Sequence, residues 1–201
     1  MQRIATKILR SIQLRRNLRT FSRDDFSHLG SRDAIAQALS RLARQGVIRR
    51  ISPGLYDVPR VNPRLGKLSP DMDAVAKAIA RKNKIALQPA GALAANLLGL
   101  STQVPAVRIY FTDGFSKQFR IGGQKIIFRH GSPRNMAGAG KISGTVFQAL
   151  RYLGRKAITN DRLAKLNQML SAKDKRVIEA DIKYTFGWIR PLALKIAVAP
   201  Y

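Results

Sequence analysis

The stretch from residue 31 to residue 58 restricts the fold of this chain more than any other. Ser31 is a typical helix N-cap, and apolar residues recur after it at helical spacing as far as Gly46, a residue suited to the left-handed conformation at a helix end. Two β-prone runs follow, at 47–51 and 55–58, joined by a Ser-Pro-Gly turn signal. The pattern predicts a helix over 32–45 that leads directly into a two-stranded hairpin.

Two more helices are predicted before this stretch. Apolar residues at helical spacing predict a first helix from Gln2 to about Leu14, with a basic outer face. Ser22 is a plausible N-cap for a short second helix, which the sequence His-Leu-Gly at 28–30 would close. Helix, helix, tight turn and helix form the outline of a helix-turn-helix unit, and the hairpin would be its wing. We therefore expect a winged helix-turn-helix domain over residues 1–60, the alternative being an ordinary hairpin beside a surface helix.

The helix predicted over 32–45 has an apolar side and a polar side. In a winged helix-turn-helix domain the polar side enters the major groove of DNA and the wing contacts the backbone or the minor groove. By chemistry, Arg32, Asp33 and Gln37 suit base edges, whereas hydroxyl and further arginine side chains suit phosphates. The predicted DNA contacts are Ser31, Arg32, Asp33, Gln37, Ser40, Arg41, Arg44, Arg49, Arg50, Gly54 and Tyr56.

Two of these predictions carry an open choice. Side chains alternate along a strand, so we expect only one of Arg49 and Arg50 to point at DNA. Tyr56 would either lie beside that arginine or be buried.

The rest of the chain predicts a mixed α and β structure. Residues 61–69 include proline and glycine and few periodic apolar positions, which indicates a linker or extended strap. Residues 70–201 are expected to form a C-terminal α+β domain with a helical end, as one domain or two. Its predicted helices are 70–82, 90–98, 144–152, 159–170, 172–185 and 189–198, and its predicted strands are 84–88, 107–112, 117–121 and 125–129. The fold class is therefore α+β.

Charge indicates the kind of partner. The chain has 37 Lys plus Arg against 11 Asp plus Glu, a formal net charge of +26. The net charges of residues 1–66, 67–140 and 141–201 are +10, +8 and +8, so the excess is not confined to a tail. This distribution argues against a neutral enzyme with a basic appendage and favours a polyanionic partner, an acidic protein, or both.

The sequence offers little for catalysis. There is no cysteine, which excludes disulfides and thiolate metal sites, and the two histidines lie in predicted turns of different domains. The Gly138–Lys141 stretch lacks the first glycine and the Ser or Thr of a phosphate-binding loop, because Asn135 and Ile142 occupy those positions. We expect no catalytic site, no cofactor and no metal.

An enzyme acting on nucleic acid remains an alternative. It would require that Asp113, Asp161 and Asp181 converge in space.

The longest apolar stretch, 85–100, is interrupted by polar residues and proline and is too short to span a membrane. We expect a cytoplasmic protein that does not bind membranes.

Three segments, taken in order, resemble a known family. They are "RRISPGLYDVPR" at 49–60, "IALQPAGALAANLLGLSTQVPAVRIYFTDG" at 85–114 and "FRIGGQKIIFRHG" at 119–131. The chain resembles, over about residues 1–190, the AbiEi family of bacterial antitoxins from type IV toxin–antitoxin systems. The resemblance implies a transcriptional autorepressor that binds inverted repeats in its own promoter through the winged domain. It also implies that the C-terminal domain supports cooperative DNA binding and neutralises a nucleotidyltransferase-like toxin, and we expect that the protein can be a monomer in solution.

A second hypothesis comes from another class of protein. A pI near 11.6 is also typical of RNA-binding proteins of the ribosomal or tRNA-processing type. Against it, the sequence shows no exposed aromatic platform of the kind that stacks on RNA bases, because its Phe and Tyr residues fall mostly in apolar strands.

Overall fold

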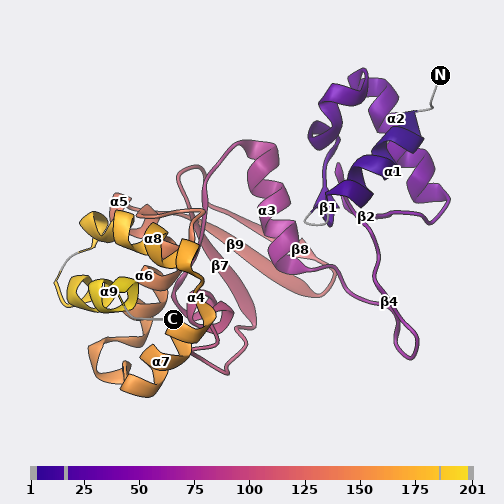
Figure 1. Cartoon of the computed structure of the whole chain (residues 1–201). Helices are drawn as coiled ribbons and strands as arrows, with labels where there is room; N and C mark the ends of the chain where they lie inside the picture. Colours follow the sequence, from indigo (N-terminus) through magenta and orange to yellow (C-terminus); the bar gives the residue numbers. More distant parts are fainter. Residues whose placement is uncertain (1–3, 16–17, 186, 199–201) are drawn as a thin grey trace. The chain divides into compact units, whose positions relative to one another are not determined.

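The computed structural model describes residues 4–15, 18–185 and 187–198 (Figure 1). The predicted α+β class is confirmed. By its internal contacts the chain divides into two units, the first comprising Met1–Lys84 with Arg120–Gln124 and the second Ile85–Phe119 with Lys125–Tyr201.

The first unit is built from helices around a small antiparallel sheet. In chain order its elements are α1 (Ile4–Leu14), β1 (Thr20–Phe21), the 3-10 helix η1 (Arg23–Leu29), α2 (Arg32–Arg44), β2 (Arg49–Ser52), β3 (Leu55–Asp57), β4 (Val61–Asn62), β5 (Gly66–Lys67) and α3 (Met72–Asn83). The sheet has the strand order β1-β3-β2. Its core joins helices and strands through Ile8, Leu18, Phe21, Phe26, Ile35, Ala38, Leu39, Leu42, Ile48 and Tyr56.

Ser22 and Ser31, which were predicted to cap helices, do so in the structure. Ser22 and Asp25 form a capping box, in which the Ser22 amide donates to the Asp25 carboxylate at 2.8 Å. Ser31 Oγ accepts a hydrogen bond from the Ala34 amide at 3.3 Å, and Gly46 has φ of +73°. The short helix is of the 3-10 type, and α2 ends at Arg44, one residue before the predicted end. Gln2, the predicted start of the first helix, lies outside the described residues.

Strand β1 was not predicted. It pairs antiparallel with β3, so that Thr20 lies opposite Asp57 and Phe21 opposite Tyr56. The Phe21 ring is stacked on Tyr56 with ring centroids 6.5 Å apart and meets Phe26 edge-on at 5.3 Å. Thr20 and Phe21, which end the first helix in the sequence, therefore add a third strand to the sheet, and the Phe21 ring is part of the core.

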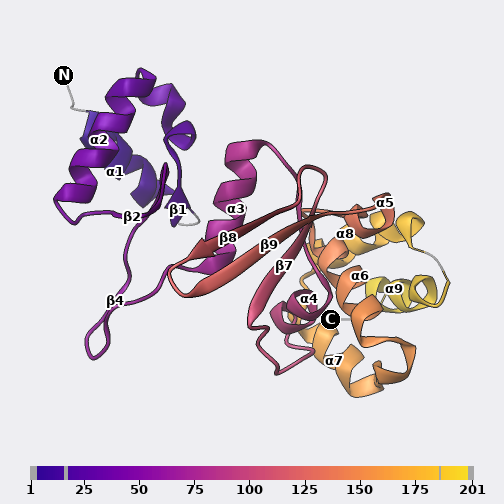
Figure 2. The ribbon, with the colours of Figure 1, turned by 180° about the vertical axis from the view of Figure 1, so that it is seen from behind.

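The predicted linker over 61–69 contains a hairpin. Val61 pairs with Lys67 and Asn62 with Gly66, and Asn62 Oδ1 accepts hydrogen bonds from the amides of Arg64 at 2.8 Å and Leu65 at 3.0 Å. The β4–β5 hairpin projects away from helices α1 and α2 (Figures 1 and 2). The proline and glycine that suggested a linker form a tight turn instead.

The first unit also extends further along the chain than the predicted boundary near residue 60. Helix α3 belongs to this unit, because Arg81 Nε contacts the Asp25 carboxylate at 3.1 Å and its Nη2 donates to the Thr20 carbonyl at 2.8 Å. Asp71, rather than Ser69, caps the helix. The helix predicted to open the C-terminal domain is therefore part of the first unit.

The second unit combines one sheet with a set of helices. Its elements are β6 (Leu87–Pro89), α4 (Gly91–Leu97), β7 (Val107–Thr112), β8 (Lys117–Ile121), β9 (Gln124–His130), α5 (Pro133–Met136), α6 (Ile142–Leu153), η2 (Arg155–Ala157), α7 (Asn160–Met169), α8 (Ala172–Asp181), η3 (Ile182–Tyr184) and α9 (Ile189–Val198). The strand order is β6-β7-β9-β8, with β6 antiparallel and β9 parallel to β7. Helices α4 to α9 gather on one side of the sheet in both views (Figures 1 and 2).

The core of the second unit is mostly helical. Residues of α4, α6, α7, α8 and α9 form one apolar cluster, which includes Ala94, Leu98, Val146, Phe147, Leu150, Leu166, Ile178, Ala193 and Ile196. Within the described part of the chain, no helix has both the length and the apolar character needed to cross a bilayer.

Gly144 marks the tightest packing between α6 and its surroundings. A β-carbon there would collide with the Gln88 side-chain oxygen and the Gly138 carbonyl. We expect Gly144→Ala to lower the free energy of unfolding by about 1–3 kcal/mol, since overpacking outweighs the helix propensity that alanine adds. Urea unfolding of the purified protein measures this.

Gly123→Ala is the control for this prediction. A β-carbon at Gly123 would meet no atom of the described residues within 4 Å, and its φ lies outside the left-handed range that favours glycine. The free energy of unfolding of this variant should stay within about 0.5 kcal/mol of the wild type. Equal stability of the two variants would contradict the packing argument.

Candidate nucleic-acid interface

The polar side of α2 is open to solvent. The four polar residues predicted to face outward, Asp33, Gln37, Ser40 and Arg44, are exposed, and so are Arg41 at their flank and Arg32 at the start of the helix. On the opposite side Ile35, Leu39 and Leu42 are buried, as the helical spacing predicted. Ser31 is also exposed, but its hydroxyl is already used to cap the helix. The helix therefore presents hydrogen-bonding and cationic groups along one accessible face.

Arg32 differs from the other polar residues of α2. It lines a hollow of about 460 Å³ together with Arg23 of η1 and Lys82 of α3. The other residues around this hollow are Asp24, Ser27, Gly30, Ile35 and Asn83. On a 100° helical wheel Arg32 lies about 120° away from the centre of the outward face, so it does not share a direction with Gln37 or Arg44. The structure thus separates Arg32 from the residues with which it was grouped.

The two arginines of strand β2 differ in their surroundings. Arg49 contacts Asp57 through Nη2 at 2.6 Å and Nε at 3.0 Å, and its Nη1 donates to the Leu68 carbonyl at 2.9 Å. These hydrogen bonds to Asp57 raise the pKa of Arg49, against a smaller opposite effect of burial. Arg50 is exposed. The Arg49 guanidinium is held by Asp57 and the Leu68 carbonyl, which favours Arg50 as the arginine that faces an outside partner; DNA contact by either stays a prediction.

Tyr56 is buried and does not lie on the exposed surface predicted to contact DNA. Its exposed fraction is 9%, and its ring belongs to the core of the first unit, stacked on Phe21. It lies opposite Arg50 in the β2–β3 pair, where the register shifts before Ser52. The Tyr56 ring packs into the core, whereas its cross-strand partner Arg50 is exposed.

The turn of the β2–β3 hairpin lies close to α3. Gly54 has φ of +71°, a left-handed conformation that favours glycine. A β-carbon at Gly54 would lie 3.3 Å from the Lys82 ammonium nitrogen. Lys82 is exposed, and no sequence signal pointed to it, because its helix was assigned to the other domain.

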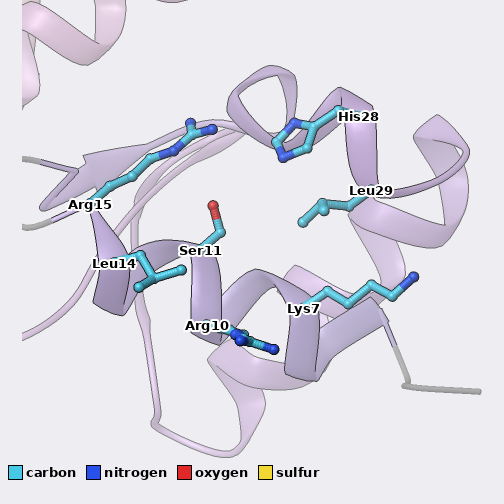
Figure 3. A pocket seen from close by; sticks show the side chains of 7 residues that line it. All are labelled: Lys7, Arg10, Ser11, Leu14, Arg15, His28 and Leu29. Atoms are coloured by element: carbon cyan, nitrogen blue, oxygen red, sulfur yellow. The ribbon is translucent and has the colours of Figure 1, made fainter.

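A second basic hollow lies between α1 and η1 (Figure 3). It measures about 360 Å³ and is lined by Lys7, Arg10, Ser11, Leu14, Arg15, His28 and Leu29. Figure 3 shows Arg15 and His28 on either side of this space with Ser11 between them. None of the described residues that line it is acidic. The spacing of Lys7, Ser11 and Arg15 along one helical face was the available sequence signal.

The glycine-rich stretch of the second unit has a structural role. Lys141 Nζ contacts the Asp181 carboxylate at 3.0 Å, and Ser143 Oγ donates to the same carboxylate at 2.6 Å. Asp181 is buried, so this network joins the start of α6 to the end of α8. Lys141 is thereby engaged with a carboxylate rather than presented to a phosphate.

The acids proposed for an enzymatic alternative do not come together. Asp113 accepts a hydrogen bond from the Ala86 amide at 2.8 Å, Asp161 is exposed in the first turn of α7, and Asp181 is held by Lys141. Among the residues that the structure describes, no three His, Cys, Asp or Glu side chains are grouped so as to hold a metal ion.

Comparison with known proteins adds a family and a distant structural likeness. A family model described as a family of unknown function (DUF6088) matches residues 7–178. A solved structure, that of the RV2827C protein from Mycobacterium tuberculosis, is similar with 13% sequence identity and a TM-score of 0.45, over 100% of this chain and 79% of that chain. No curated protein matches the sequence.

Arg49 and Arg50 of strand β2 make a matched pair for a stability test. Arg49→Met leaves the Asp57 carboxylate, whose side chain is 6% exposed, without its cation, and should lower the free energy of unfolding by roughly 1–3 kcal/mol. Arg50→Met on the same strand should change it by less than about 0.5 kcal/mol. Thermal unfolding of both variants tests the assignment, and a larger loss in the Arg50 variant would reverse it.

Proposed function

The chain belongs to the DUF6088 family, and we propose from its own geometry that it binds duplex DNA through a winged helix-turn-helix in its first unit. The observation that carries the proposal is the exposed polar face of α2, followed directly by a hairpin whose outward arginine is Arg50. A helix of this diameter fits the major groove of B-form DNA.

The order of the elements supports the proposal. Helix α1, strand β1, helices η1 and α2 and the β2–β3 hairpin follow one another as in winged helix-turn-helix domains. The sheet order β1-β3-β2 places the hairpin's second strand between its first strand and β1, which is also the arrangement of that fold. An ordinary hairpin beside a surface helix does not require this third strand.

Each exposed side chain has a role in this proposal. Gln37 suits an adenine edge and Asp33 can accept a hydrogen bond from cytosine, whereas Arg41 and Arg44 suit phosphate oxygens. Ser40 adds a hydroxyl on the same face, and the wing contributes Arg50 and the turn at Gly54. Arg49 and Tyr56 have structural roles in this proposal. Arg49 forms an ion pair with Asp57, and the Tyr56 side chain is buried in the core.

The resemblance to AbiEi antitoxins supports a narrower proposal. The protein represses its own promoter by binding inverted repeats and neutralises a nucleotidyltransferase-like toxin, without catalysis of its own. The uniformly basic surface is in keeping with DNA and an acidic partner alike. Footprinting on the genomic stretch upstream of the gene tests repression, and co-expression with the protein encoded next to it tests neutralisation.

A double substitution on α2 tests the DNA surface. Arg41→Ala/Arg44→Ala should weaken binding to any duplex, because phosphate contacts carry affinity rather than sequence preference. If six to eight phosphates are contacted, the log–log salt slope of the wild type is about −5 to −7, and the variant should lose about two of those units. A gel-shift titration at several salt concentrations measures both.

The matched control removes two basic side chains from a helix of the second unit. Lys173 and Arg176 have the same spacing and are exposed on α8, so Lys173→Ala/Arg176→Ala removes equal charge from the second unit. A drop in affinity of equal size in both double variants would show that total charge, not α2, governs binding. Displacement of a labelled promoter fragment by tRNA as readily as by unlabelled promoter would favour the RNA-binding hypothesis.

A further inference from the structure

The C-terminal end of α3 is fixed beside the proposed DNA-binding surface. Arg81 contacts Asp25 at 3.1 Å and the Thr20 carbonyl at 2.8 Å, which attaches this end of the helix to η1 and β1. The next residue, Lys82, lies within reach of the wing turn at Gly54. Helix α3 thus positions an exposed lysine that the winged fold itself does not supply.

Three cations from three elements meet at this place. Arg23 begins η1, Arg32 begins α2, and Lys82 lies near the end of α3, and all three line the hollow of about 460 Å³. Arg32 and Lys82 form no ion pair among the described residues. Arg23 has a weak one with its neighbour Asp24, at 3.7 Å between two exposed side chains. The Asp24 carboxylate is the single acid of the lining.

The surroundings of these cations also favour an anion. The hollow adjoins the first turn of α2, a helix of 13 residues, where the helix dipole and free amides favour negative charge. Ser27 adds a hydroxyl donor to the lining. Three cations with one exposed carboxylate leave a local net charge of +2, which the single negative charge of a phosphate diester would partly offset.

We propose that this hollow binds a backbone phosphate of the DNA and that α3 completes the site through Lys82. The inference rests on the proposed DNA binding and deepens it. Arg32 is then a backbone contact rather than a reader of guanine, since it lines this hollow and diverges from the outward face of α2. The DNA-binding module accordingly extends to residue 84 instead of ending near residue 60.

The test compares two lysines of the same helix in the full-length protein. Lys82→Gln should weaken binding to a duplex promoter fragment by roughly three- to tenfold and reduce the magnitude of the log–log salt slope by about one, as expected for one lost phosphate contact. Lys77 is exposed on α3 outside the hollow, so Lys77→Gln should leave both quantities unchanged. Thermal unfolding verifies that both variants fold equally well.

The outcomes separate this inference from the proposed function. A wild-type protein that fails to bind any duplex overturns the DNA proposal itself. Binding by the wild type, with unchanged affinity and salt slope for Lys82→Gln and for Arg23→Gln, overturns the phosphate site and leaves the DNA proposal standing. Equal losses for Lys77→Gln and Lys82→Gln also overturn it, because they indicate nonspecific attraction to the whole helix.

Discussion

The arrangement of the first unit depends on the ion pair between Arg49 and Asp57. The pair connects the two strands of the hairpin, and the third arginine nitrogen reaches the Leu68 carbonyl after the β4–β5 hairpin. Because Asp57 is largely buried, its carboxylate is stable there only with a cation beside it. This requirement engages Arg49 with Asp57, whereas its neighbour on β2, Arg50, is exposed.

Carboxylates are scarce in the chain as a whole. With 37 basic and 11 acidic side chains, at least 26 cations lack an acid of their own. Two of the acids that form close pairs join segments far apart in sequence, Asp25 with Arg81 and Asp181 with Lys141. These acids hold elements together, and most of the basic side chains have no acid to pair with. A polyanion meets those side chains without first having to displace internal partners.

Local signals in the sequence predicted local structure well. The caps at Ser22 and Ser31, the strand 107–112 and the helix 189–198 follow from nearest-neighbour chemistry, and the structure has them. The outward face of α2 was predicted for the same reason. The features that were missed depend on distant partners: β1 exists because β3 pairs with it, and α3 joins the first unit because Arg81 finds Asp25 56 residues away. A short window of sequence around β1 or α3 does not contain its partner, β3 or Asp25. The difference between Arg49 and Arg50 likewise depends on the position of Asp57.

The distribution of charge between the two units bears on what the second unit does. The first unit holds 20 basic and six acidic side chains, a net of +14, and the second holds 17 and five, a net of +12. Under the proposed function, a groove-reading helix accounts for the charge of the first unit alone. The second unit is a sheet with helices whose inward residues form an apolar core, and its 17 basic side chains outnumber its five acids. In that proposal the first unit recognises the DNA sequence, and the positive charge of the second unit suits sequence-independent contact with the DNA backbone or with an acidic protein.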